Sequence, residues 1–416
     1  MVRVCDAIMG SGKTSATITY INEHPEKKFL YITPYLPEAA RIKESCPDAN
    51  FAEPSDKLPQ HSFSKAVHTL ALIEEGRNIA STHQAMMYYT TDTIRMLKEG
   101  GYTLIIDEEV TVMEKERYIS INDIKIAEEA GYIYEVEPGQ YQRTDKNYAG
   151  GKFSHMFRLM ESRPLLCMRA DKRTGDVYYW VYSDKLLKSM EDVILLTYLF
   201  QDSEMEIYFK MHDVPYEYIG VRRTEDGGYN FSDKPDYVPE YTKHIFDMIH
   251  IESGERINDI GQSRTALSMG WYKTNVDAKV EQLRKNIYTF FRSKEKLSGV
   301  DGRMCGTYKE HWGQIRSKGY WNSNVQFSQK SSNEFRHRTI LAYPVNLFAN
   351  ANVVSYYSQV GYKFSNEWYA LSIMLQWIWR SAIREGKEIW LYVPSKRMRN
   401  LLLSWMKEVS KCGNMQ

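Results

Sequence analysis

The 416-residue sequence is poor in the features that mark several protein classes. Its five cysteines are widely spaced, and its ten histidines form no closely spaced metal-ligand pair beside them. This spacing argues against both a disulfide framework and a zinc site. Lysine and arginine (54) almost balance aspartate and glutamate (53), which leaves a net charge of +1. Such a chain has no bulk attraction for nucleic acid and can offer it only local basic patches.

Long apolar runs are also missing. The apolar start of the chain is interrupted by Arg3 and Asp6, which is unlike a secretory signal. No uninterrupted apolar stretch is long enough to span a bilayer. The composition, with 43% hydrophobic and 26% charged residues, is that of a globular protein of two or three domains. We therefore expect a cytoplasmic protein with no membrane segment.

One glycine-rich stretch, A-I-M-G-S-G-K-T at residues 7–14, lies between an apolar run and a helical segment. A strand, a glycine-rich turn ending in Gly-Lys-Thr and a helix form the phosphate-binding loop of nucleoside triphosphatases. Its glycines let backbone N–H groups turn inward as an anion nest, and the helix N-terminus adds its positive dipole end. We expect Lys13 to reach the β- and γ-phosphates and Thr14 to take one Mg²⁺ position. The predicted ATP-binding residues are Ala7, Met9, Gly10, Ser11, Gly12, Lys13 and Thr14.

A second signal is an apolar run that ends in three acids, at residues 102–109. The apolar part is typical of a buried parallel strand, and the acids follow where such a strand emerges. Asp107 is suited to hold Mg²⁺. Glu108 is suited to orient and deprotonate the attacking water. Together with the phosphate loop, these acids predict ATP hydrolysis.

Apolar strands alternate with helical segments through the first half, at residues 28–34, 78–83, 102–109 and 192–197. This alternation predicts an open parallel α/β sheet, whose ligands lie at the carboxyl ends of the strands. Residues of about 113–190 do not continue this alternation of strands and helices. They predict a small β-containing insertion, with a hairpin at 165–182. We expect domain 1 to span 1–204 with this insertion, and domain 2 to span 205–416. Residues 224–239 read as a polar loop.

Basic and aromatic residues are interleaved in the insertion. Such a mixture can grip single-stranded nucleic acid, although a solvated hairpin with its own core fits equally well. The residues concerned are Lys152, Phe153, Phe157, Arg158, Arg169, Lys172, Arg173 and Tyr178.

A helix is expected over residues 367–385 in the second half. Gln376, Arg380 and Arg384 recur at i, i+4 and i+8 and would form one polar stripe. The planar arginine fork binds phosphate bidentately. We therefore predict that this stripe meets a γ-phosphate.

Taken together, these motifs resemble those of superfamily 2 helicases of the DEAD/DEAH-like type, of the kind encoded by bacteriophages. Residues 7–14 fit motif I of that superfamily, in which the first residue is alanine. Residues 107–109 resemble motif II, although Glu109 and the valine after it depart from Ala-Asp and Ala-His. Residues 376–384 resemble motif VI, with tryptophan in place of glycine and the second arginine one residue late.

The resemblance implies two tandem RecA-like parallel-sheet domains, the first with the small β-containing insertion. ATP and Mg²⁺ would be the cofactors, and Arg380 or Arg384 would act as the arginine finger beside Gln376. Thr197 would couple the two domains, in the place of motif III. The implied nucleic-acid contacts are Thr33, Pro34, Ser81, Thr82 and His83.

The function implied is that of an ATP-dependent helicase or translocase in phage replication or recombination, in the host cytoplasm. DNA is favoured over RNA as its partner, and replication proteins are further candidates. With six residues before Ala7, no upstream adenine-reading glutamine motif is expected. Two alternatives stay open: a terminase-like DNA-packaging ATPase, and an ATP-switched DNA-binding or loading factor that does not unwind.

Overall fold

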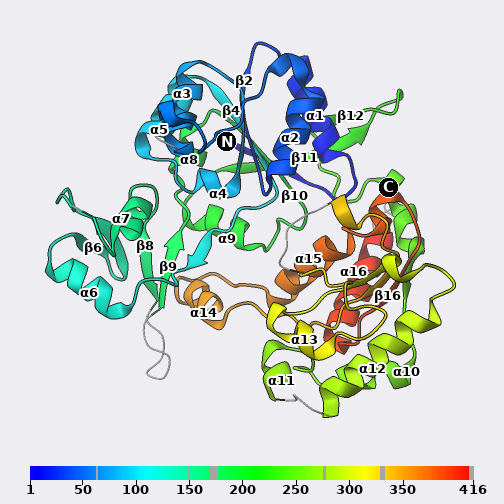
Figure 1. The fold of residues 1–416 in the computed structure, drawn as a ribbon. Coiled ribbons are helices and arrows are strands. Elements are labelled where there is room, and N and C mark those ends of the chain that lie inside the picture. Colours follow the sequence, from blue (N-terminus) through cyan, green and yellow to red (C-terminus); the bar gives the residue numbers. More distant parts are fainter. Residues whose placement is uncertain (62–63, 149, 169–176, 275–277, 328–332, 412–416) are drawn as a thin grey trace. The chain divides into compact units, whose positions relative to one another are not determined.

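The structure is a computed structural model that describes residues 1–416 except 62–63, 149, 169–176, 275–277, 328–332 and 412–416 (Figure 1). Its contacts divide the chain into two compact units. Unit 1 contains residues 1–7, 12–236 and 351–364, and unit 2 contains residues 8–11, 237–350 and 365–416. The domain boundary at 204/205 stays a prediction.

Unit 1 is built on a seven-stranded sheet in the order β12-β11-β1-β10-β4-β2-β3. All neighbours in it are parallel except β11 and β12. Asp6 is in register with Thr197, and Leu196 with Asp107, so the carboxyl ends of β1, β10 and β4 meet at one edge. The strands are β1 Val2–Asp6, β2 Lys28–Thr33, β3 Ile79–Thr82, β4 Tyr102–Asp107, β10 Asp192–Thr197, β11 Tyr216–Arg223 and β12 Tyr229–Ser232.

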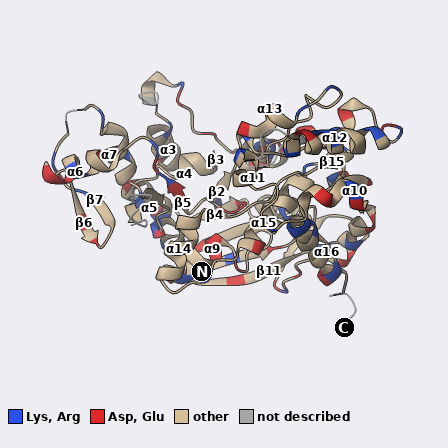
Figure 2. Cartoon of the chain, turned by 90° about the horizontal axis from the view of Figure 1, so that it is seen from below, with Lys and Arg blue, Asp and Glu red and all other residues tan. Residues whose placement is uncertain are grey.

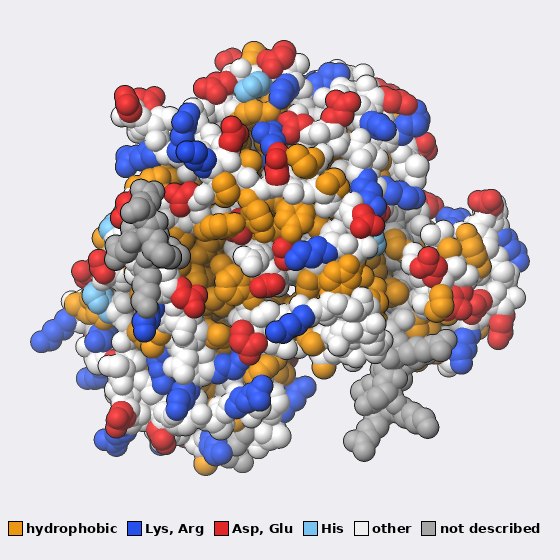
Figure 3. Space-filling view, turned by 180° about the vertical axis from the view of Figure 1, so that it is seen from behind, with side chains coloured by type: hydrophobic (Ala, Val, Ile, Leu, Met, Phe, Trp, Pro, Cys, Tyr) orange, Lys and Arg blue, Asp and Glu red, His pale blue; other side chains and the backbone are white. Residues whose placement is uncertain are grey.

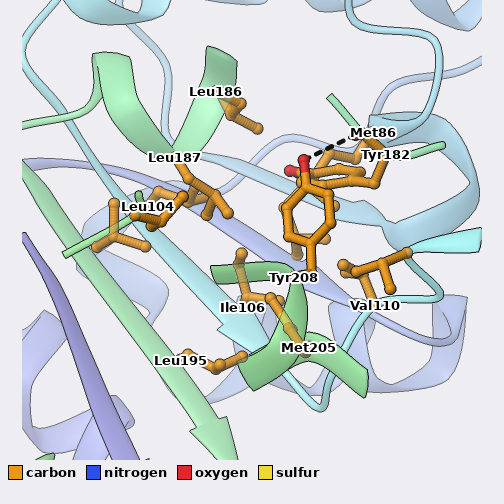
Figure 4. Close-up of a cluster of buried hydrophobic side chains, with 14 of the residues drawn as sticks. Met86, Leu104, Ile106, Val110, Tyr182, Leu186, Leu187, Leu195, Met205 and Tyr208 are labelled. Atoms are coloured by element: carbon orange, nitrogen blue, oxygen red, sulfur yellow. Dashed lines mark hydrogen bonds between the residues drawn. The ribbon is translucent and has the colours of Figure 1, made fainter. Parts of the chain in front are cut away.

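Both faces of this sheet are buried, because alternate side chains of each strand point to opposite faces. One face contributes Cys5, Phe29 and Ile105 to a core with α1 and α2. The other contributes Val4, Leu30 and Leu104 to a core with α3, α5, α8 and α9 (Figures 1 and 4). The helices of unit 1 are α1 Lys13–Glu23, α2 Leu36–Ser45, α3 Lys65–Glu74, α4 His83–Met86, α5 Thr91–Glu99, α8 Lys185–Ser189, α9 Glu204–Met211 and α14 Ala351–Gln359.

The segment 224–239, expected as a loop, contains strand β12, so that part of the prediction is wrong. Residues 224–228 close a β11–β12 hairpin, in which Gly227 has φ +87° and Gly228 N donates to Asp226 Oδ1 at 3.2 Å. Thr224 N also donates to Gly228 O at 3.0 Å. An Asp-Gly pair between alternating residues is a hairpin signal, and it was available in the sequence.

The insertion is a five-stranded antiparallel sheet in the order β5-β9-β8-β7-β6, with its own core. The predicted hairpin is present as β8 and β9, which pair antiparallel. The elements are β5 Met113–Lys115, α6 Ile121–Glu129, β6 Ile133–Glu137, β7 Gln140–Arg143, α7 Ser154–Met160, β8 Leu165–Met168 and β9 Val177–Val181.

The proposed stacking surface on the insertion is contradicted by two of its aromatic residues. Phe157 and Tyr178 are buried in the core of the insertion and cannot present a free ring to a base. Lys152 pairs with Asp123 at 2.6 Å. Arg169, Lys172 and Arg173 lie outside the described residues. The described part of this surface therefore fits a hairpin with its own core.

Unit 2 contains a four-stranded parallel sheet in the order β13-β16-β15-β14. Its central strands are β15 and β16, which pair in parallel with Ile340 opposite Trp390 and Ala342 opposite Tyr392. The elements are β13 Ile249–Ile251, α10 Glu255–Asn258, α11 Met269–Thr274, α12 Ala278–Ser293, β14 Arg303–Cys305, α13 Trp312–Ile315, β15 Ile340–Ala342, α15 Asn366–Ile378, β16 Ile389–Tyr392 and α16 Lys396–Lys411, with 3-10 turns between them. The predicted fold class is confirmed: an α/β chain with two parallel-sheet units in tandem and a β insertion in the first.

The single helix expected over 367–385 is wrong. Helix α15 ends at Ile378, and a separate 3-10 turn covers Ala382–Glu385. The buried Ser381 closes the end by donating from Oγ to Ile378 O at 2.6 Å, and Ala382 N leaves the helix to donate to Arg338 O at 2.8 Å. A 3.6-residue periodicity cannot detect such a tertiary hydrogen bond.

Segment 351–364 belongs to unit 1 by contact, although unit 2 flanks it in sequence. Val353 and Tyr357 of α14 join the same core as the sheet strands. The Tyr357 hydroxyl donates to Glu204 Oε1 at 3.2 Å. Burial raises the pKa of Glu204 to about 7, and the Tyr357 hydrogen bond opposes this shift.

The raised pKa of Glu204 predicts a pH-dependent stability. Between pH 4.5, the ordinary value of a glutamate, and 7, the folded chain holds a proton that the unfolded chain has lost. The contribution of Glu204 to stability therefore falls as pH rises through this window, by at most about 1.4 kcal/mol per pH unit. Glu204→Gln should show a flatter profile than the wild type in denaturant unfolding at pH 5, 6, 7 and 8. Parallel profiles would contradict the shift.

In the part of the chain that the structure describes, no helix combines the length and apolarity needed to cross a membrane.

Candidate nucleotide site

The phosphate loop has the backbone of an anion nest. Gly10 and Gly12 have φ of +82° and +94°, in the left-handed region that favours glycine. The loop then enters α1, whose N-terminus receives no side-chain cap and no acidic residue in its first turn. Among the residues that the structure describes, the hydroxyl of the buried Ser11 has no hydrogen-bond partner. An anion in the loop could therefore accept hydrogen bonds that the protein leaves available.

Two tyrosines form hydrogen bonds with residues 8–11 of this loop. Ile8 N donates to Tyr237 O at 2.9 Å, and the Tyr241 hydroxyl donates to Ser11 O at 2.6 Å. These residues were not singled out from the sequence, because neither tyrosine belongs to a local motif. Their contacts explain why residues 8–11 group with unit 2.

Lys13, the first residue of α1, turns back on the loop and donates from Nζ to Ala7 O. Burial lowers its pKa, while the nearby groups Cys5, Asp6, Asp107 and Glu108 oppose that shift. A phosphate would compete with the Ala7 carbonyl for this ammonium and would supply stronger, charge-assisted hydrogen bonds. Thr14 follows as the second residue of the helix.

Asp107 ends β4 and is held from two sides. Its Oδ2 accepts from the Tyr31 hydroxyl at 2.9 Å, and its backbone oxygen lies 2.9 Å from His83 Nε2. Burial and then the charge of Glu108 raise the pKa of Asp107 to about 7. A cation next to Asp107 would favour its charged form and so lower its pKa again.

Glu108 occupies a strained backbone position. It has φ +65°, a value that is costly for a residue with a Cβ, and its N–H donates to Leu196 O at 2.9 Å. Such strain is found mainly where a side chain must point in a functionally required direction. The conformation turns the chain out of β4 directly after Asp107.

The ends of β1 and β10 complete this edge of the sheet. The Thr197 hydroxyl donates to Glu109 Oε1 at 3.0 Å, and its backbone oxygen accepts from Ala7 N at 3.1 Å. Thr197 therefore joins the strand of the acids to the start of the phosphate loop. Burial raises the pKa of Glu109 to about 8.

Asp6 is a structural acid that sequence analysis did not single out. It is 2% exposed and accepts hydrogen bonds from Leu199 N at 2.8 Å and Phe200 N at 3.1 Å. Its position as the last residue before the phosphate loop could have suggested it. Asp6 fixes the turn after β10 to the strand that carries the loop.

These groups fit MgATP. The nest, the uncapped helix and Lys13 match a polyphosphate, and a carboxylate and a threonine hydroxyl are oxygen donors that suit a metal bound mainly by phosphates and water. Thr14 and Asp107 would hold Mg²⁺. The cation, when bound, neutralises charge on the phosphate oxygens.

The predicted nucleic-acid contacts lie at the same edge of the sheet, at the ends of β2 and β3. Thr33, Ser81 and His83 are 0%, 3% and 7% exposed. Thr82 Oγ1 caps α4 by accepting from Ala85 N, and Pro34 is partly exposed. Basic and acidic residues are intermingled along the chain and on the face drawn in Figure 3 (Figures 2 and 3). A role in strand binding stays a prediction for all five.

The three motif VI residues have different environments in unit 2. Gln376 is exposed on α15, whereas Arg380 is 3% exposed and donates to Gln326 O at 2.8 Å and Phe327 O at 3.3 Å. Arg384 is partly exposed on the following 3-10 turn. They therefore do not form the predicted stripe on one helix, and their catalytic roles stay predictions.

A full-length relative identifies the family. The SPbeta prophage-derived uncharacterized protein YonV of Bacillus subtilis (strain 168) is 30% identical over 414 residues, which cover 98% of each chain. The chain belongs to the YonV family. Residues 243–406 match the YonV C-terminal Rossmann-like domain, which includes the four-stranded sheet of unit 2.

Solved structures resemble the chain only distantly. S. tokodaii Xpd4 is 10% identical with a TM-score of 0.45, covering 97% of this chain and 94% of that one. S. cerevisiae Dbp5 bound to RNA and ADP BeF3 is 9% identical, with a TM-score of 0.39 and coverage of 98% and 82%. The DUF1998 helicase MrfA bound to DNA is 10% identical, with a TM-score of 0.33 and coverage of 98% and 49%. Similarity at this level says nothing about activity.

Proposed function

We propose that this YonV-family chain is a nucleic-acid-dependent ATPase of the superfamily 2 helicase type, which uses ATP hydrolysis to move on DNA. One observation carries the proposal. Lys13 follows a left-handed glycine nest after β1, Asp107 ends β4 and Glu108 follows it, and β10 lies between these two strands in the sheet. This arrangement brings together a phosphate site, a metal-binding carboxylate and a candidate base.

Each group has a distinct part in the proposed reaction. The loop and Lys13 hold the β- and γ-phosphates, and Thr14 and Asp107 hold the metal. Glu108 orients the attacking water and accepts its proton. Thr197 links the acids to the phosphate loop and so transmits changes at the γ-phosphate to neighbouring strand ends.

The choice of nucleic acid as the activator depends on the motif resemblance and on the prophage origin of the YonV relative. DNA is the preferred partner, in replication or recombination of a phage genome, and the host cytoplasm is the proposed location. Thr33, Pro34, Ser81, Thr82 and His83 are the proposed contacts. Thr33, Ser81 and His83 are buried, so the partly exposed Pro34 and Thr82 are the contacts that a nucleic-acid strand can reach directly.

The proposal predicts ATP hydrolysis that nucleic acid stimulates. Release of phosphate is measured with single-stranded DNA, duplex DNA, forked DNA and RNA in parallel. We expect stimulation by single-stranded or forked DNA and loss of hydrolysis in Lys13→Ala, because this change removes the cation that binds the β- and γ-phosphates. A rate that is the same with all four and without nucleic acid would overturn the helicase assignment.

The same preparation separates the two alternatives. Metal-dependent cleavage of plasmid DNA would favour a packaging ATPase with a nuclease half. Hydrolysis stimulated by DNA without displacement of a labelled strand would favour a switched loading factor. Strand displacement that requires ATP would support the helicase.

A further inference from the structure

Strand β12 places an aromatic side chain directly against the phosphate loop. A Cβ atom added at Gly12 would overlap the ring of Tyr229. Phe231 lies two residues after Tyr229 on the same face of β12. Its ring packs edge-on against the ring of Tyr20 in α1, with the ring centroids 5.9 Å apart. Phe231 therefore attaches the strand to the middle of α1, and Tyr229 lies at the start of that helix.

The order of the strands in the sheet determines how a nucleotide bound in the loop would be oriented. The γ-phosphate end must face Asp107 and Glu108, which end β4 on one side of β1. Strands β11 and β12 lie on the other side of β1. Phosphates held in the loop with γ toward β4 therefore direct the ribose and base toward β12. Tyr229 is a partly exposed aromatic residue on that side, and its ring lies next to Gly12.

We infer that Tyr229 packs against the ribose and base of the nucleotide and supplies the aromatic part of its binding site. This inference rests on the proposed function. Packing of a base on an aromatic ring is favourable for any base, because every base has a π-face. The ring also gives Gly12 a second constraint beyond its φ of +94°, since a side chain there would displace Tyr229.

The test compares two ligands with the same phosphates. Binding of MgADP and of magnesium pyrophosphate is measured by calorimetry on the full chain. Tyr229→Ala should weaken ADP by about 5- to 150-fold, the range expected for loss of one base–aromatic contact. Pyrophosphate affinity should be unchanged, because the loop remains. Tyr229→Trp should retain ADP binding, and Phe231→Leu should leave the ratio of the two affinities unchanged.

The outcomes separate this inference from the proposed function. Equal losses for ADP and pyrophosphate in Tyr229→Ala would show that the ring only shapes the loop, and an unchanged ADP affinity would show that the base lies elsewhere. Either result overturns the role of Tyr229 and leaves the phosphate site standing. A wild-type chain that binds neither ligand would overturn both.

Discussion

Glu108→Gln is expected to lower ATP hydrolysis by about 10²–10⁴-fold while leaving MgATP bound, because it removes the base without removing a phosphate contact. The amide has nearly the same size as the carboxylate and can keep the backbone conformation at φ +65°. Turnover is measured by phosphate release under saturating DNA, and affinity by calorimetry with ATP. The bound state should be long-lived, since substrate is held without being consumed.

Glu109→Gln is the matched control for this substitution. Glu109 is the adjacent acid, and its carboxylate accepts a hydrogen bond from the Thr197 hydroxyl. Glutamine can still accept that hydrogen bond, so Glu109→Gln should hydrolyse ATP at close to the wild-type rate. If Glu109→Gln lost turnover and Glu108→Gln stayed active, Glu109 and not Glu108 would be the base.

The sequence was sufficient to predict the strands and the helix that carry the candidate site where these consist of neighbouring residues. The phosphate loop needs a strand, glycines, Lys13 and a helix in succession, and the acids after β4 need only an apolar strand before them. The parallel sheet followed from the same local runs. The order of strands, and with it the position of Thr197 between the loop and the acids, depends on long-range pairing that periodicity does not report.

Residues that meet from distant segments were missed for the same reason. The Tyr31 hydroxyl donates a hydrogen bond to Asp107, 76 residues away in the sequence, and the Tyr241 hydroxyl donates one to Ser11, 230 residues away. Tyr229 was not predicted to lie near the loop, because the short strand β12 follows polar residues that resembled a loop. The prediction of one polar stripe on a continuous helix was wrong because Ala382 N donates to Arg338 O, a tertiary contact that periodicity does not report.

Because α15 ends before Arg380, alanine substitutions of Arg380 and Arg384 are expected to have different effects. Arg380→Ala removes a buried guanidinium from the carbonyls of Gln326 and Phe327 and should lower the stability of unit 2, by about 1–3 kcal/mol. Arg384 is partly exposed and lies outside the helix. Because Arg384 is more exposed than Arg380, it can meet a phosphate without first leaving the protein interior, so we propose Arg384 as the finger.

Arg384→Ala is therefore expected to lower DNA-stimulated turnover by about 10³–10⁵-fold, the range for loss of an arginine finger, with ATP affinity and thermal unfolding unchanged. Arg384→Lys should recover only part of the rate, because an ammonium cannot form the bidentate contact. Thermal unfolding and ATP titration are run on both alanine variants before turnover is compared. A stable, ATP-binding Arg380→Ala that loses turnover beside an active Arg384→Ala would assign the finger to Arg380, and would require its guanidinium to leave the two carbonyls during the reaction.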